Sequence, residues 1–277
     1  MSVDPPIIKP RKTSVAFRRF NRRHSNLSTH YWTHVLSAKT IEKQLKGHEP
    51  KEWAVTALGV SMKEQEYGFN VAMTVSSMDE FMNTTRLHIL AICLAQLESF
   101  IKDMAYCVAR LRDPDPRIGG LSPMAEAMAK PILGVDSLPG PLEYSESFFE
   151  VELKDEIKTL NKAYAYRCAA VHNGGYATPK AHKRLGRGDL ILNQKISIKW
   201  VELKPILLAT FDVANRIDLK WGSKALGAIE CEVELANIKS FTKLPNRNKV
   251  WAVLADAGFR LPHKTEREKI AAFFYSK

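Results

Sequence analysis

Cysteine is scarce in this chain of 277 residues, which has four: Cys93, Cys107, Cys168 and Cys231. They lie far apart and form no CxxC pair, and such sparse usage is typical of a reducing compartment, where a thiol acts as a small apolar side chain. The pattern argues against a disulfide framework and against a zinc cluster. His24, His30 and His34 have no Cys or carboxylate at ligand spacing. We therefore expect no metal and no cofactor.

Long hydrophobic runs are also missing. The most apolar helical stretch, residues 87–95, covers nine residues, contains His88 and is too short to cross a bilayer. The first twelve residues, MSVDPPIIKPRK, have no apolar core behind their basic residues, so they do not form a secretory signal. We expect a soluble cytoplasmic protein with no membrane partner.

Acidic residues are rare at the two ends of the chain. The net charge is +11 overall, but residues 1–24 hold seven Lys or Arg against one Asp, and residues 236–277 hold nine against three. Basic ends on a nearly neutral body are typical of proteins that contact a phosphate backbone, and simple solubility explains them equally well. Within the first segment the arginines are the candidate RNA contacts: Arg18, Arg19, Arg22 and Arg23.

Apolar residues at three- and four-residue spacing predict helices over residues 30–47, 77–112, 123–133, 145–172 and 201–219. Alternation over residues 69–75 (FNVAMTV) predicts a strand paired with residues 53–62, and residues 189–200 predict a second small hairpin. Two short helices are expected in the tail, at 248–257 and 264–275.

The predicted fold is therefore a mainly α bundle with small β-hairpin elements and a helical C-terminal extension. Along the chain we expect a flexible basic arm over 1–29, a helix and hairpin extension over 30–76, a helical bundle over 77–220 and a basic helical extension over 221–277. Five scattered tryptophans are interpreted as core or interface anchors and not as a stacking platform.

The segment AYAYRCAAVHNGGYAT, residues 163–178, holds the strongest chemical candidates. Arg167 and His172 are five residues apart near a helix end, a rotation of about 140° and a rise of about 7.5 Å. His172 lies in the last turn, where the helix dipole favours imidazolium. An arginine and such a histidine beside one groove are able to hold a phosphodiester and move its protons. The alternative is structural, because a histidine before a glycine stop often caps carbonyls and an arginine often pairs with a carboxylate.

Arg, four residues, then His, in a helix that runs into Asn-Gly-Gly, resembles the signature of the HEPN superfamily. LAICLAQLESFIKDM (90–104), an apolar run that carries the acidic residue Glu98, resembles the earlier core helix of that family. Residues 188–215 resemble the hairpin and closing helix that follow the motif. The resemblance covers about 77–220 and implies a helical bundle of the RNase type.

The resemblance implies metal-independent RNA cleavage, in which the 2′-OH attacks the adjacent phosphate and leaves a cyclic phosphate. His172 is then the general acid or base and Arg167 stabilises phosphoryl charge, whereas Glu98 positions Arg167 or takes a proton, or simply forms a salt bridge to it. Paired bundles in the family imply a homodimer. A toxin or antiviral defence role, and a regulatory protein partner, follow as further expectations.

Two positions depart from the family pattern. Cys168 follows the arginine where catalytic members often carry a polar residue, and Asn173 is available nearby as a substitute. Gly174 stands where members silenced by nucleotidyltransferase partners often carry Tyr. The loop after the motif supplies three further candidate RNA contacts, or is merely solvated: Lys183, Arg184 and Arg187.

Two other functions stay open. A non-catalytic HEPN-like module that binds RNA, a nucleotide or a protein is favoured by Cys168. A DNA-binding regulator is the third hypothesis, since residues 248–275 are compatible with a helix–turn–helix.

Overall fold

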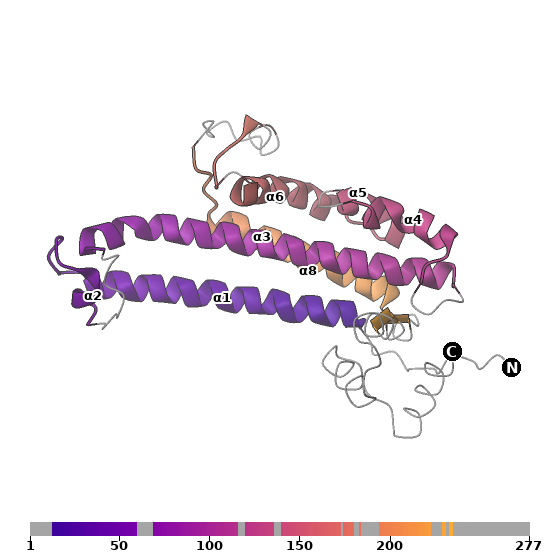
Figure 1. The fold of residues 1–277 in the computed structure, drawn as a ribbon, viewed down its shortest axis with the longest axis horizontal. Helices are drawn as coiled ribbons and strands as arrows, with labels where there is room; N and C mark the ends of the chain where they lie inside the picture. Colours follow the sequence, from indigo (N-terminus) through magenta and orange to yellow (C-terminus); the bar gives the residue numbers. More distant parts are fainter. Residues whose placement is uncertain are drawn as a thin grey trace, which may run out of the picture. The chain divides into compact units, whose positions relative to one another are not determined.

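The structure is a computed structural model that describes residues 13–59, 69–115, 120–135, 140–172, 174–179, 183, 194–222, 229–230 and 233–234. These residues are mainly helical, which confirms the expected class (Figure 1). The helices are α1 (Val15–Leu45), α2 (Ala54–Ala57), α3 (Val71–Arg112), α4 (Pro123–Leu133), α5 (Gly140–Phe149), α6 (Lys154–His172) and α8 (Trp200–Trp221). No helix in the described ranges is both long and apolar enough to span a membrane.

The chain divides into two compact units that interleave along the sequence. Unit 1 draws on residues 1–23, 95–160 and 209–277, and unit 2 draws on residues 24–94 and 161–208. The domain boundaries predicted from the sequence, after residues 29, 76 and 220, divide the chain into consecutive segments. Each unit of the structure instead combines segments that are separate in sequence. The helices α1, α3, α6 and α8 each contribute residues to both units.

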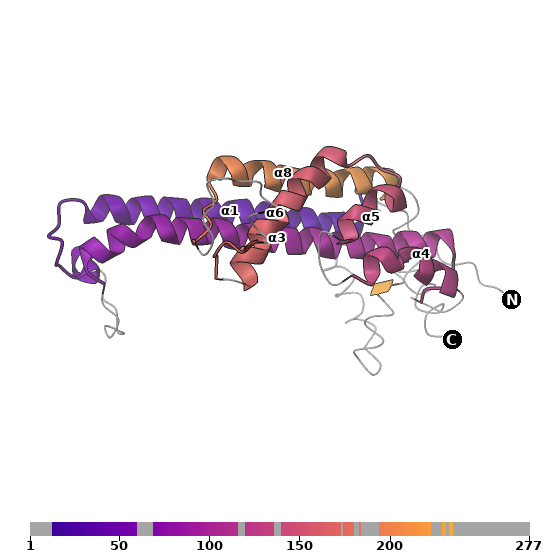
Figure 2. The same ribbon diagram turned by 90° about the horizontal axis from the view of Figure 1, so that it is seen from above.

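Aromatic and small side chains form the core of unit 1. Phe17 of α1 contacts Phe100 of α3 and Phe211 of α8, with ring centroids 6.3 and 6.0 Å apart. Ala109, Ala125 and Ala129 are fully buried together, which lets α4 approach the end of α3 closely (Figure 2). Ser122 caps α4 by accepting a hydrogen bond from the Ala125 N–H at 3.0 Å. The predicted limits of this helix, residues 123 and 133, are confirmed.

The helix expected at residue 30 begins fifteen residues earlier, at Val15, so residues 15–29 of the expected flexible arm are helical. The reason is apolar spacing, because Phe17, Phe20 and Leu27 lie on one buried face of α1 beneath the basic residues. Remote carboxylates cap its first turn. The Ser14 N–H donates to Asp218 Oδ1 at 2.8 Å, and the carboxylate oxygens of Glu230 accept from the N–H groups of the next two residues at 2.9 Å.

The helix predicted over residues 145–172 is broken. The chain ends α5 at Phe149, and Glu150 takes a left-handed φ of 54°, a conformation usual for glycine. The Val151 N–H donates to the Glu146 carbonyl at 3.1 Å and closes the end of the helix.

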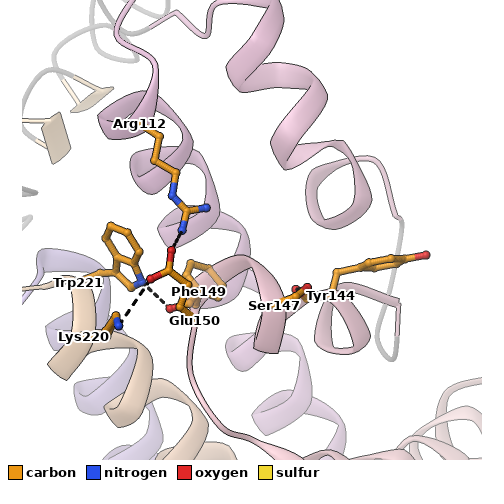
Figure 3. Close-up of polar contacts among 7 residues, drawn as sticks. All are labelled: Arg112, Tyr144, Ser147, Phe149, Glu150, Lys220 and Trp221. Carbon is orange, nitrogen blue, oxygen red and sulfur yellow. Dashed lines mark hydrogen bonds and ion pairs between the residues drawn. The ribbon is translucent and has the colours of Figure 1, made fainter.

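Three side chains hold Glu150 and its neighbour in place (Figure 3). Arg112 Nη2 lies 2.8 Å from one carboxylate oxygen of Glu150 and Lys220 Nζ lies 3.6 Å from the other. The indole N–H of Trp221 donates to the Phe149 carbonyl at 2.8 Å, and Arg112 also lies over the Trp221 ring. These tertiary contacts offset the backbone cost of a non-glycine residue at this position.

Unit 2 is built around buried residues of α3, α6 and α8. They include Leu87, Leu90 and Leu94 of α3, Ala163, Tyr166 and Ala169 of α6, and Leu203 and Ile206 of α8. His24 of α1 contacts the Leu207 carbonyl at 3.0 Å, and burial lowers the pKa of this histidine. The predicted helix over residues 201–219 is confirmed, with one to two further residues at each end.

The strand predicted over residues 69–75 is wrong, since α3 already begins at Val71. Asn70 starts the helix, because its side-chain oxygen accepts from the Met73 N–H at 2.8 Å. Residues 54–57 are helical as well, and the pairing described between residues 50–59 and 69–75 includes one antiparallel bridge, between Trp53 and Asn70. The alternating apolar residues had no sheet to cover, since Phe69, Met73 and Val75 are exposed.

The second predicted hairpin, residues 189–200, is only partly described. Lys195 pairs with Tyr176 in a single antiparallel bridge, and Trp200 is already the first residue of α8. Residues 189–193 and the two predicted tail helices, 248–257 and 264–275, lie outside the described residues.

Candidate functional site at the end of α6

The end of α6 is set by two glycines. The last helical residue is His172, as predicted, and Gly174 and Gly175 follow with φ of 58° and 88°. Glycine adopts these angles without a steric penalty. The Gly175 N–H donates to the Ala169 carbonyl at 2.8 Å, so the chain reverses directly after the last turn.

His172 is exposed at this helix end. It has no hydrogen bond or ion pair with any other residue in the described part of the chain, and the helix carbonyls of the last turn point toward the same end. The side chain is therefore accessible to a ligand. Among the described residues, no backbone carbonyl accepts a hydrogen bond from it.

Arg167 lies one and a half turns earlier on α6 and is half-buried. Its guanidinium carbon is 5.7 Å from the centre of the Tyr164 ring, a cation–π contact within one turn of the helix. A cation–π contact uses the face of the guanidinium and does not consume its N–H donors. Cys168, beside it, is half-buried and not in a disulfide.

Glu98 lies in unit 1 and Arg167 in unit 2, so their pairing stays a prediction. The contact that Glu98 does make is with Lys102, whose Nζ is 3.0 Å from Glu98 Oε1 on the next turn of α3. Asn173, Arg184 and Arg187 lie outside the described residues. Lys183 is described and exposed.

The four arginines of the basic arm divide into two pairs. Arg18 donates to the Thr13 carbonyl at 3.1 Å, and Arg19 pairs with Glu234 at 2.5 Å, so both are engaged within unit 1. Arg22 and Arg23 are exposed on α1. A phosphate backbone along this helix therefore has these two arginines as its accessible contacts.

The sequence did not indicate that residues 194–198 connect the end of α6 to α3. The Ile196 N–H donates to the Gly175 carbonyl at 2.7 Å, and the Ala177 N–H donates to the Gln194 carbonyl at 2.8 Å. Asn83 of α3 then pairs with the same segment twice at 2.9 Å, donating to the Ile196 carbonyl and accepting from the Ile198 N–H. An asparagine within a helix gives no sequence signal for this role.

This segment also positions exposed side chains near the helix end. Lys195 forms an ion pair with Glu80 of α3, and its Nζ lies 5.9 Å from the centre of the Tyr176 ring. The hydrogen bond to Glu80 raises the pKa of Lys195. A basic and an aromatic side chain, Lys195 and Tyr176, thus lie together in the segments that follow α6.

A cavity of about 330 Å³ lies in unit 1, and its lining includes Arg19, Asp103, Tyr106, Cys107, Glu230 and Glu234. Burial raises the pKa of the Cys107 thiol, and the nearby carboxylates raise it further, so this cysteine is no thiolate nucleophile at neutral pH. Desolvation likewise raises the pKa of Asp103 to about 6. Because Arg19 is already paired with Glu234, the cavity is weaker than the end of α6 as an anion site.

No cluster of three or more His, Cys, Asp or Glu residues in the described ranges has the arrangement of a metal site. Comparison with protein-family models, with curated proteins and with solved structures finds no match to this chain. The function is therefore argued from the site alone.

Proposed function

We propose that the chain is a metal-independent endoribonuclease of the HEPN type. The observation that carries the proposal is one helix end that presents an exposed His172, with Arg167 one and a half turns before it and two glycines directly after it. This arrangement puts a proton carrier and a bidentate cation beside an open turn of the chain. Those are the groups that transesterification of a phosphodiester requires.

In the proposed reaction the ribose 2′-oxygen attacks the adjacent phosphorus and its proton passes to an imidazole. The bond from phosphorus to the 5′-oxygen breaks, and that oxygen takes a proton from a second imidazole, leaving a 2′,3′-cyclic phosphate and a 5′-hydroxyl. A homodimer supplies two copies of His172 for these two proton transfers. Arg167 stabilises the charge on the phosphoryl oxygens, with Glu98 and Asn173 as supporting groups.

The biological setting proposed with this activity is a toxin or antiviral defence effector in the cytoplasm, under the control of a regulatory protein partner. The engaged Arg18 and Arg19 restrict the RNA contacts of the basic arm to Arg22 and Arg23. Lys183, with Arg184 and Arg187, supplies the contacts nearest the motif in sequence.

A non-catalytic HEPN-like RNA-binding module is the second candidate, and one observation favours it. Arg167 already contacts Tyr164, which is the behaviour of a structural arginine, and the residue beside it is Cys168. The two candidates agree that RNA binds and differ in whether it is cut.

The test compares His172→Ala with His88→Ala, because both histidines are exposed on helices of unit 2. Labelled single-stranded RNA is incubated in excess EDTA, and the products are assayed for cyclic phosphate ends. We expect cleavage by wild type and by His88→Ala, and none by His172→Ala, with the three proteins melting at nearly the same temperature.

Cleavage that needs a divalent metal and survives His172→Ala would contradict the ribonuclease. Equal RNA binding by all three proteins with no cleavage by any of them would replace it with the non-catalytic module.

A further inference from the structure

Three aromatic rings from α1 and α8 meet in unit 2. Tyr31 is buried and stacks on Trp200, with ring centroids 4.4 Å apart and ring planes 8° apart. Trp32 stands nearly edge-on to both rings, at 5.2 Å from Tyr31 and 5.3 Å from Trp200. Tryptophans that are distant in sequence are thus brought together, which the sequence interpretation did not anticipate.

The side chain of Trp32 is 45% exposed although two rings support it. An aromatic ring held in this way has little rotamer freedom left to lose when another flat group stacks on its open surface. Tyr31 and Trp200 therefore serve as the base of a platform, and Trp32 is its accessible part.

Exposed lysines follow the platform on both helices. Lys39 and Lys43 come seven and eleven residues after Trp32, which places them on the same side of α1. Lys204 comes four residues after Trp200, on the same side of α8. None of the three has an ion-pair partner in the described part of the chain.

The nearest acidic residue on α8 is already engaged. Glu202 accepts hydrogen bonds from the Tyr166 hydroxyl at 3.2 Å and from the Lys199 N–H at 2.7 Å. The surface around Trp32 therefore combines an exposed aromatic ring with exposed lysines that form no ion pair among the described residues.

We propose that Trp32, with Lys39, Lys43 and Lys204, binds single-stranded RNA by stacking a base on the indole and contacting the adjacent phosphates. Proteins that hold single strands without reading their sequence use this combination of aromatic rings and a cationic track. A second copy of the chain fits this surface less well, because a symmetric contact would bring the same lysines together. The choice of RNA as the polyanion rests on the proposed function, whereas the stacking geometry does not.

The experiment measures binding of a short single-stranded 2′-O-methyl oligonucleotide to the full chain by fluorescence anisotropy. This probe has no free 2′-OH and is not cut by the proposed reaction, so binding and cleavage are measured separately. The variants are Trp32→Ala, Trp32→Phe and the matched control Trp53→Ala. Trp53 is 57% exposed in the same unit and has no ring contact with another described aromatic residue.

We expect Trp32→Ala to weaken binding by about five- to 150-fold, Trp32→Phe to weaken it much less, and Trp53→Ala to leave it unchanged. Replacing Lys39, Lys43 and Lys204 together by Ala should make the negative slope of log affinity against log salt shallower by about 2. Trp32→Ala should leave this slope unchanged. Wild type should bind a probe with abasic sites more weakly than the normal probe. Trp32→Ala should bind the two probes with nearly equal affinity.

Equal losses for Trp32→Ala and Trp53→Ala would overturn the proposal, as would full affinity in Trp32→Ala. It would also be overturned if Trp32→Ala changed the sedimenting mass and not the affinity, which would assign the surface to a contact between two copies. Loss of binding in Trp32→Ala alongside intact RNA cleavage supports the platform as separate from the end of α6. Failure of His172→Ala to stop cleavage leaves this binding result unaffected.

Discussion

Helices α5 and α6 are both followed by residues with left-handed backbone, but these residues differ in type and in how they are supported. At the end of α5, in unit 1, Glu150 takes this conformation and is held by Arg112 and Lys220, while Trp221 binds the adjacent carbonyl. At the end of α6, in unit 2, Gly174 and Gly175 need no such support, and His172 stays exposed. The first end uses its polar groups for stability, and the second leaves them accessible to a ligand.

The same difference extends to the two units. Several polar groups of unit 1, including Asp218, Glu230 and Arg19, cap α1, close α5 or pair with one another. Unit 2 presents an exposed imidazole, an exposed indole and lysines without ion pairs among the described residues. We therefore expect substitutions of these capping and pairing groups in unit 1 to change stability, and substitutions of the exposed groups in unit 2 to change binding and catalysis.

The largest expected effect is on catalysis by Arg167→Lys. Lysine keeps the charge but loses the planar fork that grips two phosphoryl oxygens, so the cleavage rate should fall by about two to three orders of magnitude, about 3–4 kcal/mol. RNA affinity should hardly change, because other cations supply most of the binding. Single-turnover cleavage measured beside anisotropy checks both. Arg112→Lys is the control in unit 1 and should leave cleavage unchanged.

Turnover within a few-fold of wild type would make Arg167 a structural residue that only contacts Tyr164. Combining Arg167→Lys with Glu98→Gln separates the two roles further, since an ion pair between them predicts that the two effects do not add.

Next in size is the stability effect of Trp221→Phe. Removing the indole N–H leaves the buried Phe149 carbonyl without that donor, which should lower the free energy of unfolding by about 1–3 kcal/mol. Urea denaturation followed by circular dichroism measures the loss. RNA cleavage by the folded variant should remain at the wild-type rate, and a loss of cleavage with intact folding would break the proposed difference between the units.

A smaller effect isolates the backbone cost at Glu150. Glu150→Gly and Glu150→Ala both remove the ion pairs, but only alanine keeps a Cβ at a φ of 54°. The glycine variant should therefore be more stable than the alanine variant by about 1 kcal/mol. Thermal melting of the two variants side by side gives this difference directly.

Gly174→Ala is the converse substitution in unit 2. The added Cβ would meet only ordinary contacts, the nearest at 3.8 Å from Tyr176, so the expected loss of stability of about 1 kcal/mol comes from the left-handed backbone alone. Equal stability of the Gly and Ala variants at position 150 would show that Glu150 is not strained.

The smallest effect is a pH dependence in unit 1. Desolvation raises the pKa of Asp103 to about 6, so the folded chain binds a proton there more readily than the unfolded chain does. The resulting stability is complete below about pH 4 and is lost as the pH rises through 6. Asp103→Asn should match wild type near pH 4 and exceed it above pH 6 by at most about 1 kcal/mol, because the carboxylate keeps access to solvent.

Free energies of unfolding measured in urea between pH 4 and pH 8 check this sign. A variant that runs parallel to wild type over the whole range would show that Asp103 does not titrate in this window.

Local signals in the sequence were sufficient for several elements. The helix predicted over residues 123–133 begins at Pro123, and Asn-Gly-Gly marked the end of α6, because proline and glycine act on their immediate neighbours. The break after Phe149 had no such signal, since Glu150 is tolerated there only through residues from α3 and α8. The strand prediction at residues 69–75 was wrong because an alternating pattern does not show whether the apolar side chains have a surface to pack against.

The candidate site divides in the same way. Arg167 and His172 were found from their spacing along one helix, which is a local property. Asn83, and the contact between Trp32 and Trp200, depend on segments that are distant in sequence, and one chain without an alignment gives no sign of them. Arg18 and Arg19 were assigned to RNA from their charge alone. The sequence shows no sign of the partners that they have within unit 1, and their contact with RNA stays a prediction.

The capping of α1 by Glu230 has a consequence for the order of folding during synthesis. Val15 and its cap are 215 residues apart, and the ribosome adds about 5–20 residues per second, so the first turn of α1 waits roughly 10–40 seconds for the carboxylate that completes it. The first turn of α1 is therefore completed only after residue 230 has been made. Until then the first turn of α1 exposes backbone donors beside an apolar face that includes Phe17 and Phe20, and a chaperone is able to bind it there.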